Sequence, residues 1–260
     1  MGPAAGSDSP TELLYGLHAV REALKSESRP FQRILVMRTD RQYAEIVRSA
    51  KARGVPVHVE PSSAFDRLVP NGRHQGIIAQ VAAKSYSTPE SILQLAQDRR
   101  EAPLLVILDG VEDPHNLGAI VRTAEAGGVH GVFIPERRAA GLTSAVAKAS
   151  AGALDHMSVG RVVNVSRLIS ELKESGLWVY GVEPSAQVAY DEIDMTGPIA
   201  VVLGGEGQGI RPGVLNECDE RISIPMKGKV ASLNVSAAAA VILYEAVRQR
   251  KTKTKAAVST

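Results

Sequence analysis

The sequence predicts an α/β protein with a C-terminal parallel-sheet domain and a smaller N-terminal α/β domain. Three observations support this prediction. Apolar strand-like runs alternate with amphipathic helical runs between residues 103 and 250. A looser stretch with Ser, Thr and Pro at 84–102 separates that pattern from an earlier one and is predicted to be a linker. Finally, 260 residues with 44% hydrophobic content can bury one large core or two modest ones.

The N-terminal domain is predicted to span residues 11–83, after a small, polar and disordered segment at 1–10. Between residues 11 and 86, twelve basic residues stand against seven acidic ones, a net charge of +5. This excess would suit RNA phosphates, and a solvated basic surface without a partner explains it too. Strands and helices are expected to alternate at Tyr15–Leu24 (helix), Gln32–Met37 (strand), Arg41–Arg53 (helix), Val55–Glu60 (strand), Ser62–Val69 (helix) and Gly76–Val81 (strand).

The C-terminal domain is predicted to span residues 103–252, followed by a basic tail at 253–260. Ligands of open parallel sheets bind where the strands end and loops gather. Strands are expected at Leu104–Asp109, Val129–Ile134, His156–Val163, Trp178–Val182, Ile199–Leu203 and Ile222–Met226. Helices are expected at Leu117–Ala126, Thr143–Ala153, Val165–Glu174 and Pro212–Cys218, and from about Val235 onward.

Two loops that follow predicted strands carry candidate binding residues. In the first, Asn116 is predicted to cap a helix and Arg122 to lie about two turns further on, where its guanidinium suits a phosphate. An ion pair of Arg122 with Glu112 or Glu125 is the alternative. The second loop, GGEGQG, places Glu206 among four glycines that would let backbone approach a ligand closely. It is neither a dinucleotide fingerprint nor a phosphate-binding loop.

A third loop, from Lys227 to Ala231, leads into the final helix, for which Ser232 and Asn234 are candidate N-caps. Helix N-termini offer unpaired N–H groups to a polar ligand. A single loop of this kind is weak evidence, because many α/β proteins contain one. Three such loops, each after a predicted parallel strand, indicate a shared ligand site.

Composition excludes several other classes. The net charge of +2 does not by itself require a nucleic-acid partner. The single cysteine, Cys218, excludes an intramolecular disulfide and a cysteine zinc site, and no metal is expected. Neither a signal peptide nor a membrane span is recognisable, so a cytoplasmic protein is expected.

The three loops together resemble the motifs of the SpoU (TrmH-like) ribose 2′-O-methyltransferases. Asn116-Leu117-Gly118 with Arg122-Thr123-Ala124 resembles the first motif, and residues 204–209 resemble the second, G-x-E-x-x-G. Ile224-Pro225-Met226 with Ser232-Leu233-Asn234-Val235-Ser236 resembles the third. YGLHAVREAL and HQGIIAQV, in the N-terminal domain, resemble the ribosomal-L30-like substrate-binding domain of the subgroup that methylates a guanosine ribose in large-subunit rRNA.

This resemblance implies a fold, a cofactor and partners. It implies a SPOUT domain with a deep trefoil knot, S-adenosylmethionine as methyl donor, an RNA substrate (rRNA in the first place) and a homodimer. The implied catalytic residues are Asn116, Arg122, Glu206 and Asn234, and the resemblance implies Arg122 as general base. Because a guanidinium group rarely gives up a proton, we expect Arg122 to stabilise the developing alkoxide instead, with Glu206 or water as proton acceptor. The implied cofactor-binding residues are Leu203, Gly204, Gly205, Glu206, Gly207, Ile224, Met226, Ser232, Leu233 and Asn234.

Three alternatives remain open. The same chemistry could act on tRNA or on another rRNA nucleotide. The fold could serve a ribosome-assembly factor that binds RNA without catalysis. A nicotinamide-dependent oxidoreductase shares the fold class, although the first βα turn lacks its glycine fingerprint.

Overall fold

The computed structural model describes residues 11–70 and 72–258, with side chains up to residue 253, and it divides into two compact units. The first unit contains the chain up to Ser85 together with Leu142–His156, and the second contains Tyr86–Gly141 and the chain from Met157 onward. Residues 142–156 therefore pack with the N-terminal unit, although the sequence places them within a continuous domain at 103–252. The predicted disorder of residues 1–10 lies outside the described residues.

The first unit has a four-stranded mixed sheet in the order β1-β4-β2-β3. The antiparallel pairs are β1–β4 and β2–β4, and β2 is parallel to β3. The strands are β1 (Thr11–Tyr15), β2 (Phe31–Val36), β3 (Val57–Val59) and β4 (Ile77–Ala82). The helices are α1 (Leu17–Ser26), α2 (Ala44–Ala52), α3 (Ser62–Leu68) and α6 (Ser144–Ala149), with a 3₁₀ turn at Ala153–Asp155.

The start of this unit differs from the sequence prediction. Tyr15 was expected to begin a helix, but it ends β1, and α1 begins only at Leu17. Gly16 separates the two elements with a φ of 96°, a conformation that glycine adopts without steric cost. The helical periodicity of the following residues extended the predicted helix across this turn.

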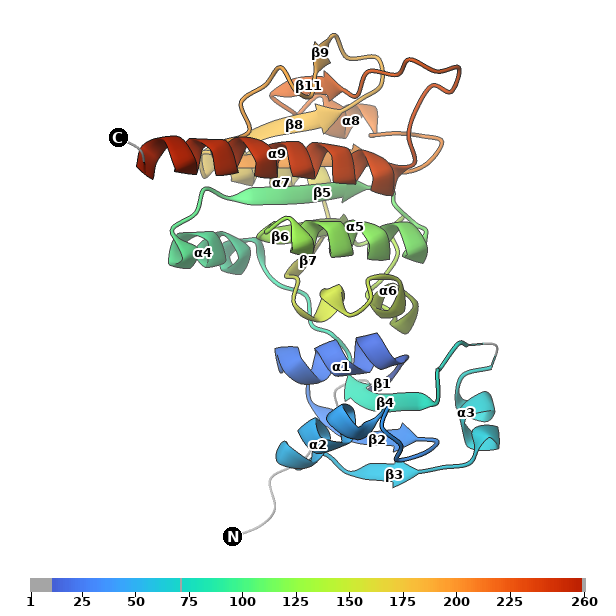
Figure 1. The fold of residues 1–260 in the computed structure, drawn as a ribbon. Coiled ribbons are helices and arrows are strands. Elements are labelled where there is room, and N and C mark those ends of the chain that lie inside the picture. Colours follow the sequence, from blue (N-terminus) through green and yellow to red (C-terminus); the bar gives the residue numbers. More distant parts are fainter. Residues whose placement is uncertain (1–10, 71, 259–260) are drawn as a thin grey trace. The chain divides into compact units, whose positions relative to one another are not determined.

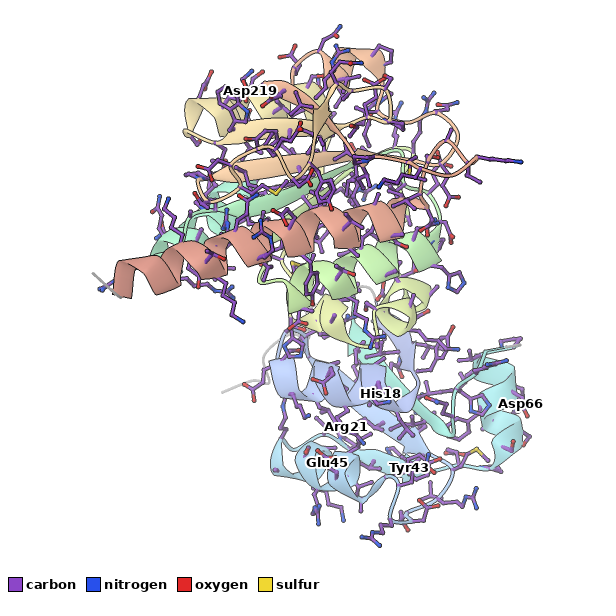
Figure 2. The ribbon with its side chains drawn as sticks, turned by 45° about the horizontal axis from the view of Figure 1, so that its top comes forward. His18, Arg21, Tyr43, Glu45, Asp66 and Asp219 are labelled. Atoms are coloured by element: carbon purple, nitrogen blue, oxygen red, sulfur yellow. The ribbon has the colours of Figure 1, made fainter. Side chains whose placement is uncertain are left out.

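Polar side chains link neighbouring elements of the first unit (Figure 2). Arg21 of α1 pairs with Glu45 of α2 at 3.3 Å. The Tyr43 hydroxyl donates to the Gln75 carbonyl oxygen at 2.9 Å, and His74 lies 3.5 Å from Asp66. Because Glu45 and Asp66 are largely exposed, their ion pairs orient the elements more than they stabilise them.

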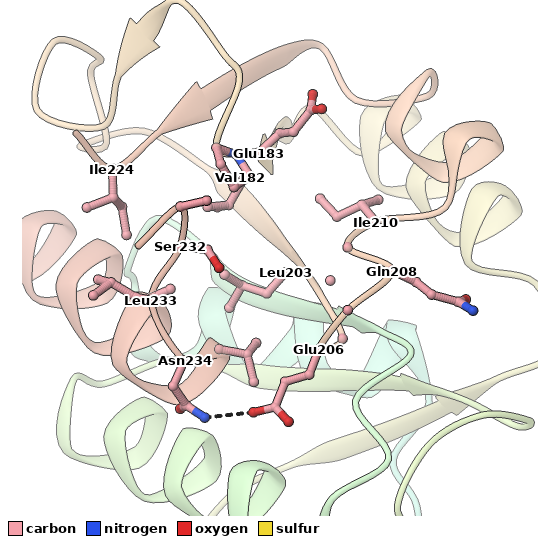
Figure 3. Close-up of a pocket in the computed structure, with 18 of the residues that line it drawn as sticks. Val182, Glu183, Leu203, Glu206, Gln208, Ile210, Ile224, Ser232, Leu233 and Asn234 are labelled. Carbon is pink, nitrogen blue, oxygen red and sulfur yellow. Dashed lines mark hydrogen bonds between the residues drawn. The ribbon is translucent and has the colours of Figure 1, made fainter. Parts of the chain in front are cut away.

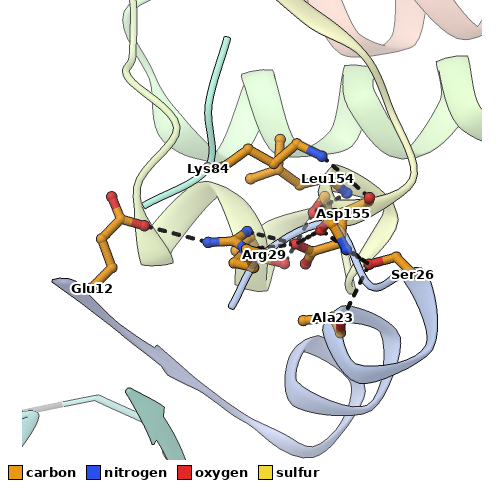
Figure 4. Close-up of polar contacts among 10 residues, drawn as sticks. Glu12, Ala23, Ser26, Arg29, Lys84, Leu154 and Asp155 are labelled. Atoms are coloured by element: carbon orange, nitrogen blue, oxygen red, sulfur yellow. Dashed lines mark hydrogen bonds and ion pairs between the residues drawn. The ribbon is translucent and has the colours of Figure 1, made fainter. Parts of the chain in front are cut away.

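A buried ion pair fixes the returning segment within the first unit (Figure 4). Arg29 and Asp155 are each 3% exposed, and Arg29 Nη2 lies 2.7 Å from Asp155 Oδ1. Ser28 donates a hydrogen bond to the same carboxylate, and Lys84 Nζ donates to the Asp155 carbonyl oxygen at 3.2 Å. Burial raises the pKa of Glu12, which lies 3.5 Å from Arg29. Removing one partner of such a pair leaves a buried charge and costs about 3–5 kcal/mol.

Lys84, beside this pair, should make stability depend on pH. Burial lowers its pKa from 10.5 to about 8, so between those values the unfolded chain binds more protons than the folded one. The folded state is penalised below pH 8, and the penalty is relieved as the pH rises to 10.5. Relative to Lys84→Met, the unfolding free energy of the wild type should therefore rise by roughly 3 kcal/mol across this range. Denaturant titrations at pH 7, 8.5 and 10 measure this difference, and a constant difference would contradict it.

The second unit contains a seven-stranded sheet in which every pair of neighbouring strands is parallel, as predicted. The predicted strand at His156–Val163 begins only at Val159, and β9 was not predicted because it is two residues long. In spatial order the strands are β7 (Val159–Val162), β6 (Gly131–Pro135), β5 (Leu104–Asp109), β10 (Ile199–Gly204), β8 (Trp178–Val182), β11 (Glu220–Ser223) and β9 (Val188–Ala189).

Helices cover both faces of this sheet. Leu105 and Ile107 of β5 pack into a core with α4 (Pro89–Arg99), α7 (Val165–Glu174) and α8 (Pro212–Leu215). Since side chains alternate along a strand, the intervening residues of β5 point to the opposite face. There α5 (Pro114–Ala126) and α9 (Val235–Val258) lie against each other (Figure 1). Because α9 continues to Val258, most of the predicted basic tail forms its last turns.

The strand order brings the three candidate loops to one edge of the sheet. β5 and β10 are neighbours, and β11 is separated from β10 only by β8. Parallel strands end at the same edge. The loops that follow β5, β10 and β11 therefore lie on one side of the second unit.

Candidate functional site

In the first loop, between β5 and α5, the residue that caps the helix is not the predicted Asn116. Helix α5 begins at Pro114, and Asp113 is its N-cap, accepting the His115 backbone N–H at 2.9 Å. Aspartate caps helices as well as asparagine does, and proline is favoured at the first helical position. Asn116 instead lies in the first turn of α5, where it is 8% exposed. The prediction of Asn116 as N-cap was wrong.

The side chains of Asn116, Glu206 and Asn234 meet, although they follow three different strands. Figure 3 shows the bond between Asn234 and Glu206. Both asparagine amides donate to Glu206 Oε1 at 2.8 Å. The Asn234 amide also donates to Asn116 Oδ1 at 3.1 Å. These bonds join the loops that follow β5, β10 and β11, as the sequence led us to expect.

Asn234 is held in place by a second set of bonds. Its Oδ1 accepts the Ser236 backbone N–H at 2.9 Å, the geometry of an N-cap on α9. The Ser236 hydroxyl donates to the same oxygen at 2.6 Å. Asn234 is therefore the cap that the sequence predicted, whereas the other candidate, Ser232, lies before the helix and lines a cavity. With its oxygen bound to α9, the amide of Asn234 can point only its N–H groups at Glu206.

The glycines of the second loop allow close contact within the protein. The Gly205 N–H donates to the Asp109 carbonyl oxygen at 2.8 Å, and a Cβ on Gly205 would lie 1.8 Å from the Gly110 carbonyl oxygen. A Cβ on Gly204 would lie 2.1 Å from the Gly209 carbonyl carbon. We expected these glycines to admit a ligand. Instead, glycine is needed at positions 204 and 205 because neighbouring backbone leaves no room for a side chain.

The buried carboxylate of Asp109, which was not predicted as a site residue, holds this loop in place. Asp109 at the end of β5 is 1% exposed and lies 2.6 Å from Arg211 Nη2. Its other oxygen accepts the Arg211 backbone N–H at 2.8 Å. Asp109 and Arg211 thus fix the beginning of the first loop to the end of the second. Aspartate at a strand end followed by glycine was the only hint in the sequence.

A cavity of about 540 Å³ opens between the second and third loops (Figure 3). Its lining includes every residue predicted to bind a cofactor: Leu203, Gly204, Gly205, Glu206, Gly207, Ile224, Met226, Ser232, Leu233 and Asn234. The residues that follow β8, Val182 to Pro184, also line it and were not predicted. Glu183 and Glu206 are its charged residues, and no lysine or arginine is among the described residues that line it. We call it the donor cavity, because the resemblance implies that a methyl donor binds these residues.

A second cavity of about 410 Å³ lies on the other side of Glu206, beside Asn116. The two cavities share the second loop and Val235. We call it the arginine cavity because Arg137, Arg138 and Arg211 line it.

Arg122, the fourth predicted catalytic residue, lines neither cavity. It lies six residues beyond Asn116 on α5, about 9 Å further along the helix axis, and it is exposed. Within the described part of the chain it forms no ion pair, so the alternative pairing with Glu112 or Glu125 is not observed.

Among the described residues, no group of three or more His, Cys, Asp or Glu side chains could hold a metal ion. The same part of the chain has no helix that is both long and apolar enough to cross a membrane. Burial raises the pKa of the Cys218 thiol to about 11, which leaves it protonated at neutral pH and a poor nucleophile.

Comparison with known proteins identifies the family of both domains. Residues 103–244 match the SpoU rRNA Methylase family, and residues 13–87 match the RNA 2′-O ribose methyltransferase substrate binding family. YacO of Bacillus subtilis (strain 168), by name a TrmH family tRNA/rRNA methyltransferase, is 43% identical over 240 residues, which cover 92% of this chain and 96% of YacO.

Solved structures show the same fold. The SpoU methyltransferase AviRb from Streptomyces viridochromogenes superposes with a TM-score of 0.79 at 25% identity, over 94% of this chain and 91% of AviRb. AviRb in complex with the cofactor AdoMet gives a TM-score of 0.78 at 24% identity, over 93% of this chain and 91% of that one. The chain belongs to the SpoU rRNA methylase family, and it is an RNA methyltransferase of the SpoU/TrmH type with an N-terminal substrate-binding domain.

Proposed function

We propose that the protein transfers a methyl group from S-adenosylmethionine to the ribose 2′-hydroxyl of a guanosine in large-subunit rRNA. The observation that carries this proposal is the meeting of Asn116, Glu206 and Asn234 at the wall of the donor cavity. The AdoMet complex of AviRb, which has the same fold, supports the choice of donor.

The donor cavity suits S-adenosylmethionine in size, polarity and charge. Its volume lies within the range of about 300–1,000 Å³ that is usual for cofactor sites. Ile210, Ile224 and Leu233 offer apolar surface for a base, and the glycine loop offers backbone groups. The carboxylates of Glu183 and Glu206 complement the positive charges of a sulfonium and an ammonium group. A dinucleotide diphosphate would require cations there, which argues against the oxidoreductase alternative.

S-adenosylmethionine, when bound, supplies a methyl group on sulfur that is already a good leaving group. The protein must then align the acceptor hydroxyl and accept its proton. Glu206 is suited to receive the proton. Its Oε1 is occupied by the two amides, while no described residue donates to Oε2. Asn116 and Asn234 hold this carboxylate between the two cavities.

We propose that the active form is a homodimer in which α5 of one protomer supplies Arg122 to the site of the other. Its exposure, and its absence from both cavities of its own chain, support this role. There Arg122 would stabilise the developing alkoxide or bind a neighbouring phosphate. We also propose that the segment from β10 to α9 forms a trefoil knot, since the resemblance implies one.

The choice of a guanosine in rRNA rests on the N-terminal domain. Residues 13–87 match a family named for RNA 2′-O ribose methyltransferase substrate binding, and this part of the chain carries a net positive charge. A tRNA nucleotide, or another rRNA nucleotide, is the second candidate, because YacO is named for both RNA classes. Both substrates would be met in the cytoplasm.

Methyl transfer to RNA tests the proposal. The full chain, incubated with S-adenosylmethionine and either unmodified rRNA or tRNA, should create one linkage in rRNA that resists alkaline cleavage, next to a guanosine. A resistant linkage in tRNA alone would contradict the rRNA assignment. RNA binding without any methyl transfer would contradict the enzymatic function and favour an assembly factor.

A further inference from the structure

The arginine cavity adjoins the donor cavity through a shared wall. Gly205, Glu206, Gln208, Gly209 and Val235 line both. A group held in the arginine cavity would therefore lie next to the Glu206 carboxylate and the Asn116 amide that joins it. This is where the acceptor of a group transferred from the donor cavity would have to lie.

The two cavities differ in the basic residues that line them. No lysine or arginine lines the donor cavity in the described part of the chain, whereas three arginines line the other. Arg211 is bound to Asp109, but Arg137 and Arg138 are exposed and make no ion pair with a described residue.

The carboxylates of the arginine cavity are mostly engaged elsewhere. Asp109 is paired with Arg211, Asp113 caps α5, and Glu206 accepts two amides. Glu112 alone among them is exposed without a described partner. Counted over the whole lining, four carboxylates stand against three guanidinium groups, so a phosphate would find its positive partners only at the exposed and unpaired Arg137 and Arg138.

The turn that carries these arginines is fixed, while their side chains are free. It follows β6, and Arg138 adopts a left-handed conformation with a φ of 60°. Two hydrogen bonds, each to a backbone carbonyl oxygen, anchor it. The Ala140 N–H donates to the Val111 carbonyl oxygen at 3.0 Å, and Arg161 donates to the Glu136 carbonyl oxygen at 3.1 Å. Such a turn presents two guanidinium groups to the cavity at little cost in backbone entropy.

We propose that the arginine cavity receives the acceptor nucleotide of the RNA, and that Arg137 and Arg138 bind the phosphate beside its ribose. This inference rests on the proposed function. Guanidinium groups bind phosphate oxygens in a bidentate manner, and the phosphate would hold the ribose in the position from which its hydroxyl faces the donor cavity. Arg137 and Arg138 are thus positioning residues for the acceptor.

The salt dependence of RNA binding tests this role. The full-length Arg137→Ala/Arg138→Ala variant should lose about 0.7 in the slope of log K against log salt for each phosphate contact removed. At a fixed moderate salt concentration, the KM for RNA should rise at least about tenfold, and S-adenosylmethionine affinity should stay within about twofold. The Arg137→Lys/Arg138→Lys variant should keep most of the slope, because a phosphate contact survives as a point charge.

A matched control is available in the same unit. Arg99 and Arg100 are also adjacent and exposed, Arg100 also has a positive φ (55°), and neither lines either of the two cavities. Arg99→Ala/Arg100→Ala should bind RNA like the wild type. Equal slopes in the two double variants would overturn the proposal, as would a wild type that does not bind RNA. If the wild type binds RNA with the expected difference in slope but transfers no methyl group, the proposed function fails and the phosphate site stands.

Discussion

Replacing Gly205 by alanine should abolish both methyl-donor binding and most of the activity. The new Cβ would lie 1.8 Å from the Gly110 carbonyl oxygen, and both groups belong to backbone that cannot rotate away. The first and second loops would have to separate, which breaks the bond from the Gly205 N–H to Asp109 and displaces Glu206. Overpacking costs about 1–3 kcal/mol of stability, and a 1 Å displacement of a site can cost about 100-fold in rate. Calorimetric titration with S-adenosylmethionine measures the loss of donor binding, and thermal unfolding measures the loss of stability.

Gly213→Ala is the control for this variant. Gly213 lies in α8, a Cβ added to it would have no neighbouring atom within 4 Å, and its φ is not in the left-handed region. The control should bind the donor and unfold like the wild type. A Gly205→Ala protein with unchanged donor affinity would show that contact between the loops does not shape the cavity.

Replacing Arg122 by alanine should reduce turnover by about 10²–10³ and leave donor affinity within about twofold of the wild type. Arg122 lines neither cavity of its own chain, so its removal leaves the walls of the donor cavity intact. Its proposed role concerns the acceptor alone, at the site of the partner protomer. Single-turnover kinetics, together with calorimetry, separate the two quantities.

A mixing experiment tests the role of Arg122 across the dimer. Arg122→Ala and Glu206→Ala chains, each inactive alone, should regain up to about one quarter of the wild-type activity when reassociated, since one complete site forms in half of the dimers. As a control, Arg167→Ala, which removes an exposed arginine on α7, should leave methyl-transfer activity unchanged. Equal loss of donor affinity and turnover in Arg122→Ala would show that the residue has a structural role.

The central strands of the second unit can be predicted from the sequence because each is marked by its own continuous apolar run. Leu104–Asp109 and Ile199–Leu203 are continuous apolar runs, and each becomes a buried central strand of the parallel sheet. The polar residues just after those strands then meet, because parallel strands end at one edge. This reasoning is enough to predict that the side chains of Asn116, Glu206 and Asn234 lie close together.

Features that depend on long-range packing could not be predicted in the same way. Residues 142–156 return to the first unit through the buried pair of Asp155 with Arg29, which lie 126 residues apart. Asn116 was expected to cap α5 because asparagine and aspartate cap helices equally well, and the proline after Asp113, which favours Asp113 as the cap, was not weighed. Glu183 was missed because a lone glutamate after a strand has no distinctive spacing.

The most direct test of the proposed donor site is a crystal structure of the full chain with S-adenosylmethionine. We expect the donor in the cavity lined by Leu203, Ile224 and Leu233, with its sulfonium group on the side of Glu206. Donor bound in the arginine cavity, or away from the three loops, would show that these loops do not form the donor site.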